Sequence, residues 1–391
     1  MAVVPKNVLA MFVETACKYP NQVAIEMDEQ IWTYGELLTN VHHIAQNVAI
    51  DRGQIVYQYM DRSLEMVCGI LGIMCAGGVY CPLNTGDPPM RIRSLLDEVQ
   101  GHIALVHRST RDNFLSISNG EIKIIDIEKL LSMDFTANSF TEKGNLTFIH
   151  ELIFFDFALF TEIFIDDESS SYIIGTSGTT GRPKIILHTH KSLQATMQAM
   201  INWDARCSNK VLQVAACSWI IHLFEILLPL IVDKPGTLIL LRPGDNLNMS
   251  RFCMNIKNKE ITFIFVAPSM IKAMIDYLEL NNHEHYGTLE TLRIILSGGE
   301  ASKPKHLAKL KSFASQAKLF MIYGLTEVNT AIGCYLDYDI DELANLNILP
   351  IGRPLFGYRC LLVDEIDGHI ISSSNLNEIG QIHLAGNILI V

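Results

Sequence analysis

Residues 172–184 combine glycines, hydroxyl side chains and two cations at a spacing suited to binding a polyanion. They read Tyr-Ile-Ile-Gly-Thr-Ser-Gly-Thr-Thr-Gly-Arg-Pro-Lys. Glycine lets the backbone approach phosphates in conformations that a Cβ would forbid, and successive backbone N–H groups in such a loop form a concavity for anions. Pro183 precedes Lys184, so the segment is not the Gly-x-x-x-x-Gly-Lys-Ser/Thr loop that opens a helix. The pattern predicts a cradle for a nucleotide triphosphate; the alternative is an ordinary surface turn.

The elements that must position this loop alternate between strand-like and helical runs. Residues 7–19 and 63–74 have helical spacing, and the run from Lys184 predicts that the loop joins two strands. Such alternation predicts βαβ units, and therefore an α/β fold with mostly parallel sheets flanked by helices. The predicted buried strands are 55–59, 77–83, 211–215, 237–241, 262–266 and 292–296.

The alternation of strand-like and helical runs ends near Leu349. Residues 358–363, 368–371 and 381–385 read as short strands joined by turns, without helices between them. We therefore expect an α/β core of two sheet subdomains over 1–348, followed by the start of a small barrel-like β subdomain over 349–391. The aromatic and acidic segment 132–167 fits an extra buried helix, a surface for a partner, or an artefact of the gene model.

Composition excludes several classes of protein. The 391 residues are 49% hydrophobic and 18% charged, which is typical of a globular protein, and the net charge of −12 disfavours nucleic acid or an anionic membrane as partner. The nine cysteines form no Cys-x-x-Cys pair, which favours reduced thiols. The apolar run 220–232 is too short to span a bilayer, and no secretory signal precedes it. We expect a soluble, cytoplasmic protein.

Seven segments occur in the order found in adenylate-forming (AMP-binding) enzymes, and their wording is closest to nonribosomal peptide synthetase adenylation domains. This resemblance implies the large N-terminal domain of that fold, with ATP and Mg²⁺ as cofactors. It also implies attack of a small-molecule carboxylate on the α-phosphate of ATP, giving an acyl-adenylate and pyrophosphate, a reaction in which the protein positions groups and neutralises charge. The segments are 32–37, 76–83, 172–184, 292–301, 323–327, 351–354 and 380–386.

The resemblance assigns roles to individual residues. Tyr323 can stack on the adenine, Thr326 can hydrogen-bond the α-phosphate, and Glu327 can hold Mg²⁺. Thr326, Glu327 and Lys184 are the expected catalytic residues. The paired glycines of the segment 292–301 suit a flat base at a strand end, or form a plain strand-to-helix turn. The implied ATP contacts are Thr176, Ser177, Gly178, Thr179, Thr180, Gly181, Lys184, Gly298, Gly299, Glu300, Ile322, Tyr323, Gly324 and Thr326.

The implied substrate pocket departs from the family pattern. Ile220 stands where adenylation domains have the aspartate that binds the substrate's α-ammonium group, so a buried ammonium would cost several kcal/mol. We expect an aryl, keto or fatty acid. His222 either contacts a substrate or is a core residue. Met321 stands where the family has an asparagine that contacts adenine, and losing that hydrogen bond costs roughly 1 kcal/mol of ATP binding. The pocket residues implied by register are Ile220, Ile221, Phe224, Leu296, Gly298, Ile322, Thr330 and Ala331.

Three functions fit the sequence up to Val391, which ends before the family's Tyr-Arg-Thr-Gly-Asp element, lid domain and catalytic lysine. The first is an adenylation enzyme that passes its product to a phosphopantetheine-bearing carrier protein. The second is a free-standing acid–CoA ligase, favoured by Leu325 in place of the usual proline. The third is a catalytically inactive remnant that binds ATP.

We predict that residues 1–391 alone form little acyl-adenylate, because the lid domain also closes the site against water. ATP–pyrophosphate exchange with the isolated segment measures this activity. Robust exchange would contradict the prediction.

Overall fold

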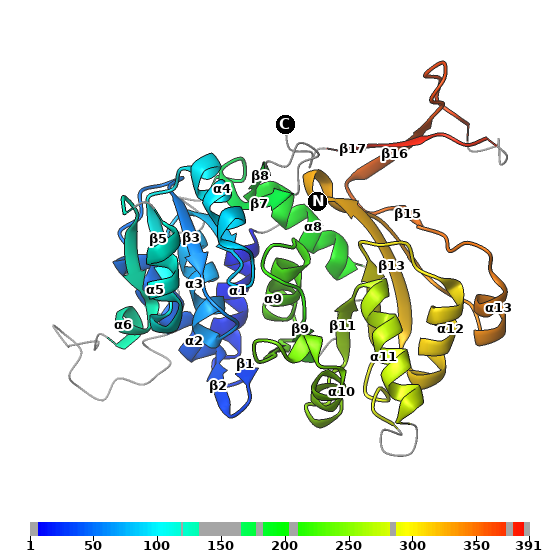
Figure 1. The fold of residues 1–391 in the computed structure, drawn as a ribbon, viewed down its shortest axis with the longest axis horizontal. Coiled ribbons are helices and arrows are strands. Elements are labelled where there is room, and N and C mark those ends of the chain that lie inside the picture. The colour runs from blue at the N-terminus through cyan, green and yellow to red at the C-terminus, as the bar shows by residue number, and fades with distance from the viewer. Residues whose placement is uncertain are drawn as a thin grey trace.

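The computed structural model describes residues 7–118, 120–132, 166–176, 183–202, 210–281, 287–372 and 378–386. These residues form two large sheets with helices on their faces, and a two-stranded hairpin near the C-terminal end (Figure 1). Within these ranges, every helix is too short or too polar to cross a membrane.

The smaller sheet has six strands in the order β6-β5-β3-β4-β7-β8. The first five are parallel, and β8 runs antiparallel to β7 at the edge. Parallel neighbours need long crossovers, which α3 (Leu64–Cys75), α4 (Pro89–Val99) and α5 (Arg108–Ile117) help to supply. The strands are β3 Ile55–Tyr59, β4 Val79–Leu83, β5 Ile103–Val106, β6 Lys123–Asp126, β7 Ser170–Thr176 and β8 Lys184–Thr189.

The larger sheet has nine strands in the order β15-β14-β13-β12-β11-β9-β10-β1-β2. The six strands from β13 to β1 are parallel, and β2, β14 and β15 run antiparallel at the edges. The strands are β1 Val23–Met27, β2 Gln30–Thr33, β9 Lys210–Gln213, β10 Thr237–Leu240, β11 Phe263–Val266, β12 Ile294–Gly298, β13 Lys318–Leu325, β14 Asn329–Tyr335 and β15 Arg353–Pro354.

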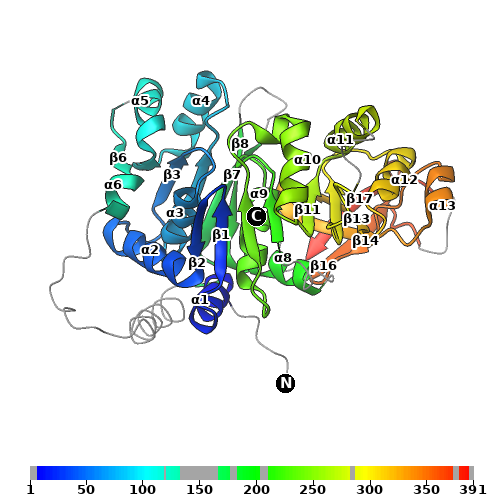
Figure 2. The same cartoon turned by 90° about the horizontal axis from the view of Figure 1, so that it is seen from below.

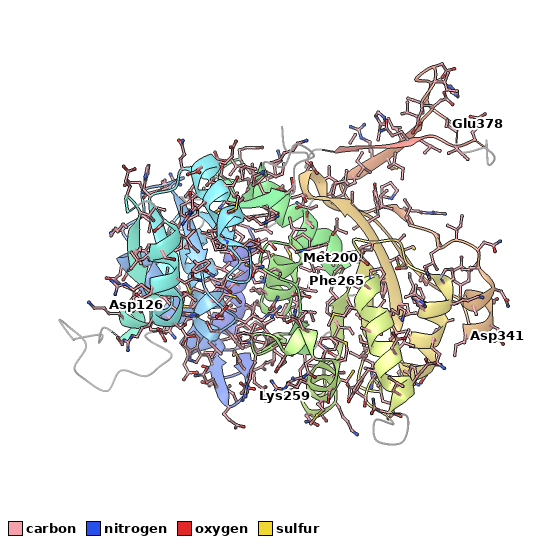
Figure 3. All side chains as sticks on the ribbon, in the orientation of Figure 1. Asp126, Met200, Lys259, Phe265, Asp341 and Glu378 are labelled. Carbon is pink, nitrogen blue, oxygen red and sulfur yellow. The ribbon has the colours of Figure 1, made fainter. Side chains whose placement is uncertain are left out.

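Helices form a layer between the two sheets and cover their outer faces (Figures 1 and 2). One buried core joins α1 (Val8–Lys18), α2 (Tyr34–Asn47), α3 and α9 (Ile221–Ile231) to both sheets, and Met200 of α8 and Phe265 of β11 belong to it (Figure 3). In β3 the side chains alternate, so that Val56 joins this central core and Tyr57 the outer core under α4 and α5. The remaining helices are α6 Ile127–Ser132, α8 His190–Asn202, α10 Met249–Asn258, α11 Pro268–Leu280, α12 Pro304–Phe313 and α13 Ile340–Asn345.

The predicted α/β fold with mostly parallel sheets is confirmed. The predicted strand 55–59 has its observed bounds, and the predicted strand 77–83 contains β4 but begins two residues before it. Segment 172–184 does join two strands, β7 and β8. The segment 32–37 starts α2 with a capping box, in which Glu36 N–H donates to Thr33 Oγ1 at 3.2 Å and Thr33 N–H to Glu36 Oε2 at 2.7 Å.

The C-terminal region fits its prediction in part. The hairpin pairs β16 (Tyr358–Val363) with β17 (Gln381–Gly386), but the predicted strand 368–371 is wrong, because its residue Ile370 forms only an isolated bridge to Val363. β15 lies inside the range assigned to the subdomain yet pairs with β14 of the core. Of segment 132–167, only Ser132, Asp166 and Asp167 lie within the described residues.

A buried polar network ties the two sheets together where β3 and β9 end. Arg62, just after β3, donates to Gln213 Oε1 and to the Val214 carbonyl, both at 2.6 Å. Glu225 of α9 accepts from the backbone N–H groups of Val214 and Ala215, both at 2.9 Å, and from Gln213 Nε2 at 3.0 Å. Burial raises the pKa of Glu225 to about 8, against the opposing effect of these N–H donors and of Arg62.

We predict that Glu225 makes stability fall as pH rises toward neutrality. Because its pKa lies above the ordinary value of 4.5, the folded protein holds a proton there that the unfolded chain releases. That contribution is complete below the unfolded pKa and is lost as pH rises through about 8. Urea unfolding from about pH 5 to about pH 9 should show wild type losing stability relative to Glu225→Gln. Glu98→Gln, an exposed carboxylate on α4, is the control, and parallel curves for wild type and Glu225→Gln would contradict the prediction.

Candidate functional site

A cavity of about 570 Å³ opens where the carboxyl ends of strands from both sheets meet, the edge at which ligands of open α/β sheets bind. It draws on β7 and β8 of the smaller sheet and on β11 and β13 of the larger one. The predicted site residues that line it are Thr176, Lys184, Ile220, Ile221, Gly299, Ile322, Gly324, Thr326, Glu327 and Thr330.

The turn that carries Thr326 and Glu327 depends on a glycine. β13 ends at Leu325 and β14 begins at Asn329, with a single 3₁₀ turn between them. A Cβ on Gly324 would lie 1.8 Å from the Asn329 carbonyl oxygen, so only glycine allows this close return of the chain. The turn presents Glu327 as an exposed carboxylate on the cavity wall, beside the partly buried Thr326.

The two ends of the predicted phosphate loop lie on the opposite wall. Thr176 pairs with Lys184 across β7 and β8, and Thr176 Oγ1 donates to the Lys184 carbonyl at 3.4 Å. Lys184 is exposed, which leaves its ammonium group free to meet an anion. The predicted contacts Ser177, Gly178, Thr179, Thr180 and Gly181 lie outside the described residues and stay predictions.

The paired glycines at the end of β12 have different tasks. A Cβ on Gly298 would lie 2.4 Å from the Ile322 carbonyl oxygen, so Gly298 lets β12 approach β13, and it does not line the cavity. Gly299 lines the cavity with φ +85°, and the Trp219 ring lies 3.2 Å from where its Cβ would be. Glu300 accepts from Ser269 N–H at 3.2 Å and from its hydroxyl at 3.1 Å at the start of α11, away from the cavity.

One wall of the cavity is apolar. Ile220, Ile221, Phe265 and Ile322 line it, and among the described lining residues Glu327 is the one acidic side chain. Tyr323 is partly buried and does not line the cavity, so its stacking on adenine stays a prediction. The other predicted pocket or adenine positions that do not line it are buried core residues, namely Phe224, Leu296, Met321 and Ala331.

The prediction did not place several lining residues in the site. Arg91 lies outside the matched segment 76–83, and it pairs with Asp87 at 3.0 Å. Asn329 carries no sequence signal, since it follows the matched segment 323–327. The others are Ile174, Gly175, Ser218, Trp219, Phe265 and Leu325.

A second cavity of about 560 Å³ lies on the other side of a short segment. Residues 215–217 line the second cavity, and residues 218–221 line the first. His222, for which the sequence left two roles open, lines the second cavity with 1% of its surface exposed. Burial, reinforced by Arg62, lowers the pKa of His222 to about 3, so the imidazole is neutral, and its Nε2 has no partner among the described residues.

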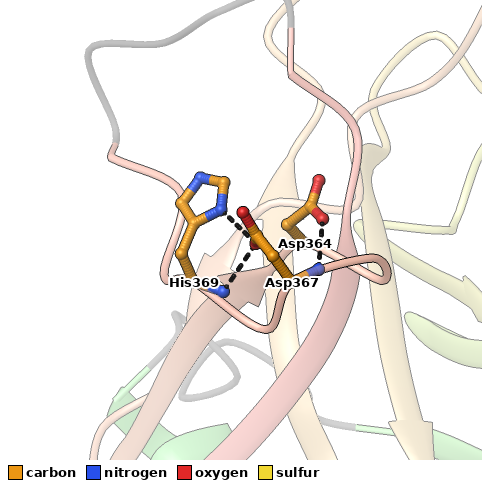
Figure 4. A group of neighbouring side chains, drawn as sticks. All are labelled: Asp364, Asp367 and His369. Carbon is orange, nitrogen blue, oxygen red and sulfur yellow. Dashed lines mark hydrogen bonds and ion pairs between the residues drawn. The ribbon is translucent and has the colours of Figure 1, made fainter.

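Asp364, Asp367 and His369 form a cluster on the hairpin with donor atoms within 4.8 Å of one another (Figure 4). Asp364 Oδ1 accepts from the N–H groups of Ile366 and Asp367, and His369 Nδ1 lies 2.6 Å from Asp367 Oδ1. Asp367 and His369 are exposed and Asp364 is partly buried. These bonds close the turn between strands, which accounts for the cluster.

Comparisons with known proteins agree on one family. A family model described as "AMP-binding enzyme" matches residues 12–390. Bacitracin synthase 1 of Bacillus licheniformis is 28% identical over 367 residues, which is 92% of this chain but 6% of that protein. The chain therefore spans a small part of this relative.

Solved structures share the fold. The NpsA N-terminal subdomain of Klebsiella oxytoca, in complex with 3-hydroxybenzoyl-AMSN, has a TM-score of 0.76 at 19% identity, covering 98% of this chain and 88% of that one. The AMPPNP-bound nonribosomal peptide synthetase FmoA3 has a TM-score of 0.79 at 18% identity, covering 99% of this chain and 38% of that one. The chain has the fold of these nonribosomal peptide synthetase adenylation structures. Because the family model spans nearly every residue, the chain belongs to the AMP-binding enzyme family.

Proposed function

We propose that this chain carries the ATP- and acid-binding part of an enzyme that activates a carboxylic acid as an acyl-adenylate and releases pyrophosphate. The observation that carries the proposal is the first cavity. It combines Thr176 and Lys184 from one sheet with Thr326 and Glu327 from the other, and an apolar wall adjoins them.

The groups on the polar wall suit the reaction. Lys184 would bind phosphate oxygens, and the Thr326 hydroxyl would donate to the α-phosphate. A substrate carboxylate oxygen then bonds to the α-phosphorus while the bond from that phosphorus to the bridging oxygen breaks and pyrophosphate leaves. Because no covalent bond to the protein forms, these residues act by orientation and charge.

The exposed carboxylate of Glu327 fits a hard divalent cation, which prefers oxygen ligands. Bound there, Mg²⁺ would neutralise charge on the triphosphate. Glu327 holds this place because Gly324 allows the tight turn before it.

The apolar wall supports an acid without a conventionally bound α-amine. Ile220 and Ile221 offer no acceptor, and an ammonium group placed against them would lose its hydration without a partner. An aryl, keto or fatty acid fits this wall. The relative NpsA was solved with a 3-hydroxybenzoyl ligand, which agrees with an aryl acid.

The second cavity supports transfer to a thiol acceptor, because residues 215–217 line it and the next four residues, 218–221, line the first cavity. We propose that a phosphopantetheine arm of a carrier protein enters there. An acid–CoA ligase is the second candidate, since Leu325 lines the first cavity where adenylation domains usually have proline.

The free thiols among the described cysteines fit a cytoplasmic protein.

The direct test is ATP–pyrophosphate exchange by a chain extended beyond Val391, with amino, aryl, keto and fatty acids offered in turn. Exchange with one acid class supports the proposal. No exchange, alongside retained ATP binding, would leave only the inactive remnant. Thioester formation is then measured with a carrier protein and with CoA, which distinguishes an adenylation enzyme that acts with a carrier protein from an acid–CoA ligase.

We predict that Glu327→Gln removes most of the gain in ATP affinity that Mg²⁺ brings to residues 1–391. Losing a contact of about 1.4 kcal/mol corresponds to a factor of about ten. Isothermal titration with ATP, with and without Mg²⁺, measures this gain. Glu98→Gln should keep it, and an unchanged gain in Glu327→Gln would contradict the assignment.

We predict that Ile220→Asp improves activation of α-amino acids relative to aryl acids, because the new carboxylate can pair with the ammonium group. In exchange assays of the extended chain, the ratio of the two rates should shift by roughly tenfold or more. Ile366→Asp, on an isoleucine 96% exposed on the hairpin, is the matched control. Unchanged selectivity would mean that Ile220 does not face the acid.

A further inference from the structure

Asn329, the residue after the Thr326–Val328 turn, has an unusual backbone. Its φ of +58° and ψ of −140° form a combination that glycine adopts and other residues rarely do. The residue is 2% exposed, and its carbonyl oxygen occupies the space where Gly324 would have a Cβ. Such a conformation persists only where the surrounding structure holds it.

The side-chain amide of Asn329 supplies that hold across the two sheets. Tyr172 Oη, on β7 of the smaller sheet, donates to Asn329 Oδ1 at 3.0 Å. Asn329 Nδ2 donates to Thr196 Oγ1 on α8 at 3.2 Å. Tyr172 and Thr196 are fully buried, so water cannot replace either partner.

Neighbouring groups fix both partners of the amide. Tyr358 Oη donates to the Val328 carbonyl at 2.7 Å and lies 3.4 Å from Thr196 Oγ1. The His188 ring stacks on the Tyr172 ring, with centroids 4.4 Å apart and planes 8° apart. The turn is therefore held on one side by β7 and on the other by β16.

The amide joins the two halves of the proposed phosphate site. Tyr172 lies on the strand that ends at Thr176, where the phosphate loop begins, and Asn329 lies two residues after Glu327. A triphosphate that contacts both walls needs them at a fixed separation, and this bond is buried between them.

We propose that Asn329 is a positioning residue that, through Tyr172, holds the Thr326–Glu327 turn at a fixed distance from Thr176 and Lys184, so that Mg²⁺·ATP contacts both walls. The inference rests on the proposed function, because it assigns the triphosphate to this cavity. The proposed role concerns contacts to the β- and γ-phosphates and not contacts to the nucleoside. Loosening the bond weakens Mg²⁺·ATP binding, while AMP, which lacks the β- and γ-phosphates, loses little.

Two variants of residues 1–391 test the proposal. Asn329→Gly keeps a backbone that suits the observed dihedral angles and deletes the amide, and Tyr172→Phe deletes only the hydroxyl. The ratio of Mg²⁺·ATP affinity to AMP affinity should fall about tenfold in each, a change typical of losing one buried hydrogen bond. The double variant should fall little further, because both changes break the same bond.

Tyr34→Phe is the matched control. Tyr34 Oη is buried and donates to the carbonyls of Pro229 and Gly236, both at 2.9 Å, outside the lining of either cavity. It should lower the unfolding temperature and leave the affinity ratio unchanged. If Asn329→Gly fails to fold, Tyr172→Phe decides alone.

Folded variants with an unchanged ratio would overturn the proposal, as would a proportional loss of Mg²⁺·ATP and AMP affinity, which a merely structural role would give. If wild type binds AMP but gains nothing from the added phosphates and Mg²⁺, the proposed function fails and the inference with it. If wild type binds Mg²⁺·ATP and the affinity ratio falls only in the Asn329 and Tyr172 variants, the result supports both the proposed function and the positioning role.

Discussion

Arg62 joins the two sheets at the edge where both cavities open. Its guanidinium group donates to the side chain of Gln213 and the backbone of Val214, and Glu225 receives the N–H groups of the same segment. These bonds anchor the start of the segment 215–221, whose residues 215–217 line the second cavity and whose residues 218–221 line the first. Removing Glu225 would leave the backbone N–H groups of Val214 and Ala215 without this acceptor, which is costly for buried donors.

Given this anchoring, the first cavity separates two kinds of chemistry. Lys184, Thr326 and Glu327 line its polar part, which we propose for the phosphates, whereas Ile220, Ile221 and their neighbours form the apolar part that we propose for the acid. The shape of the site rests on glycines whose Cβ atoms would collide with backbone carbonyls.

The sequence predicted the fold where the signal is local. Ile55–Tyr59 and Val79–Leu83 are short apolar runs between helical segments, and they form neighbouring parallel strands. Segment 368–371 ends in two isoleucines but forms only one bridge, because pairing depends on a partner strand that composition does not show.

The site was predictable as a set of segments rather than as a surface. Phe224 lies on α9, which is buried on all sides, so no periodicity indicates which residues face the cavity. The bond from Tyr172 to Asn329 joins residues 157 positions apart, and neither side chain is unusual alone. Contacts of this kind depend on how the sheets meet, which local patterns do not encode.

The most direct measurement is a crystal structure of this chain with a non-hydrolysable ATP analogue and Mg²⁺. We expect the triphosphate to lie between Lys184 and Thr326, with the metal at Glu327. A nucleotide bound in the second cavity, or one whose phosphates contact neither wall of the first, would contradict it.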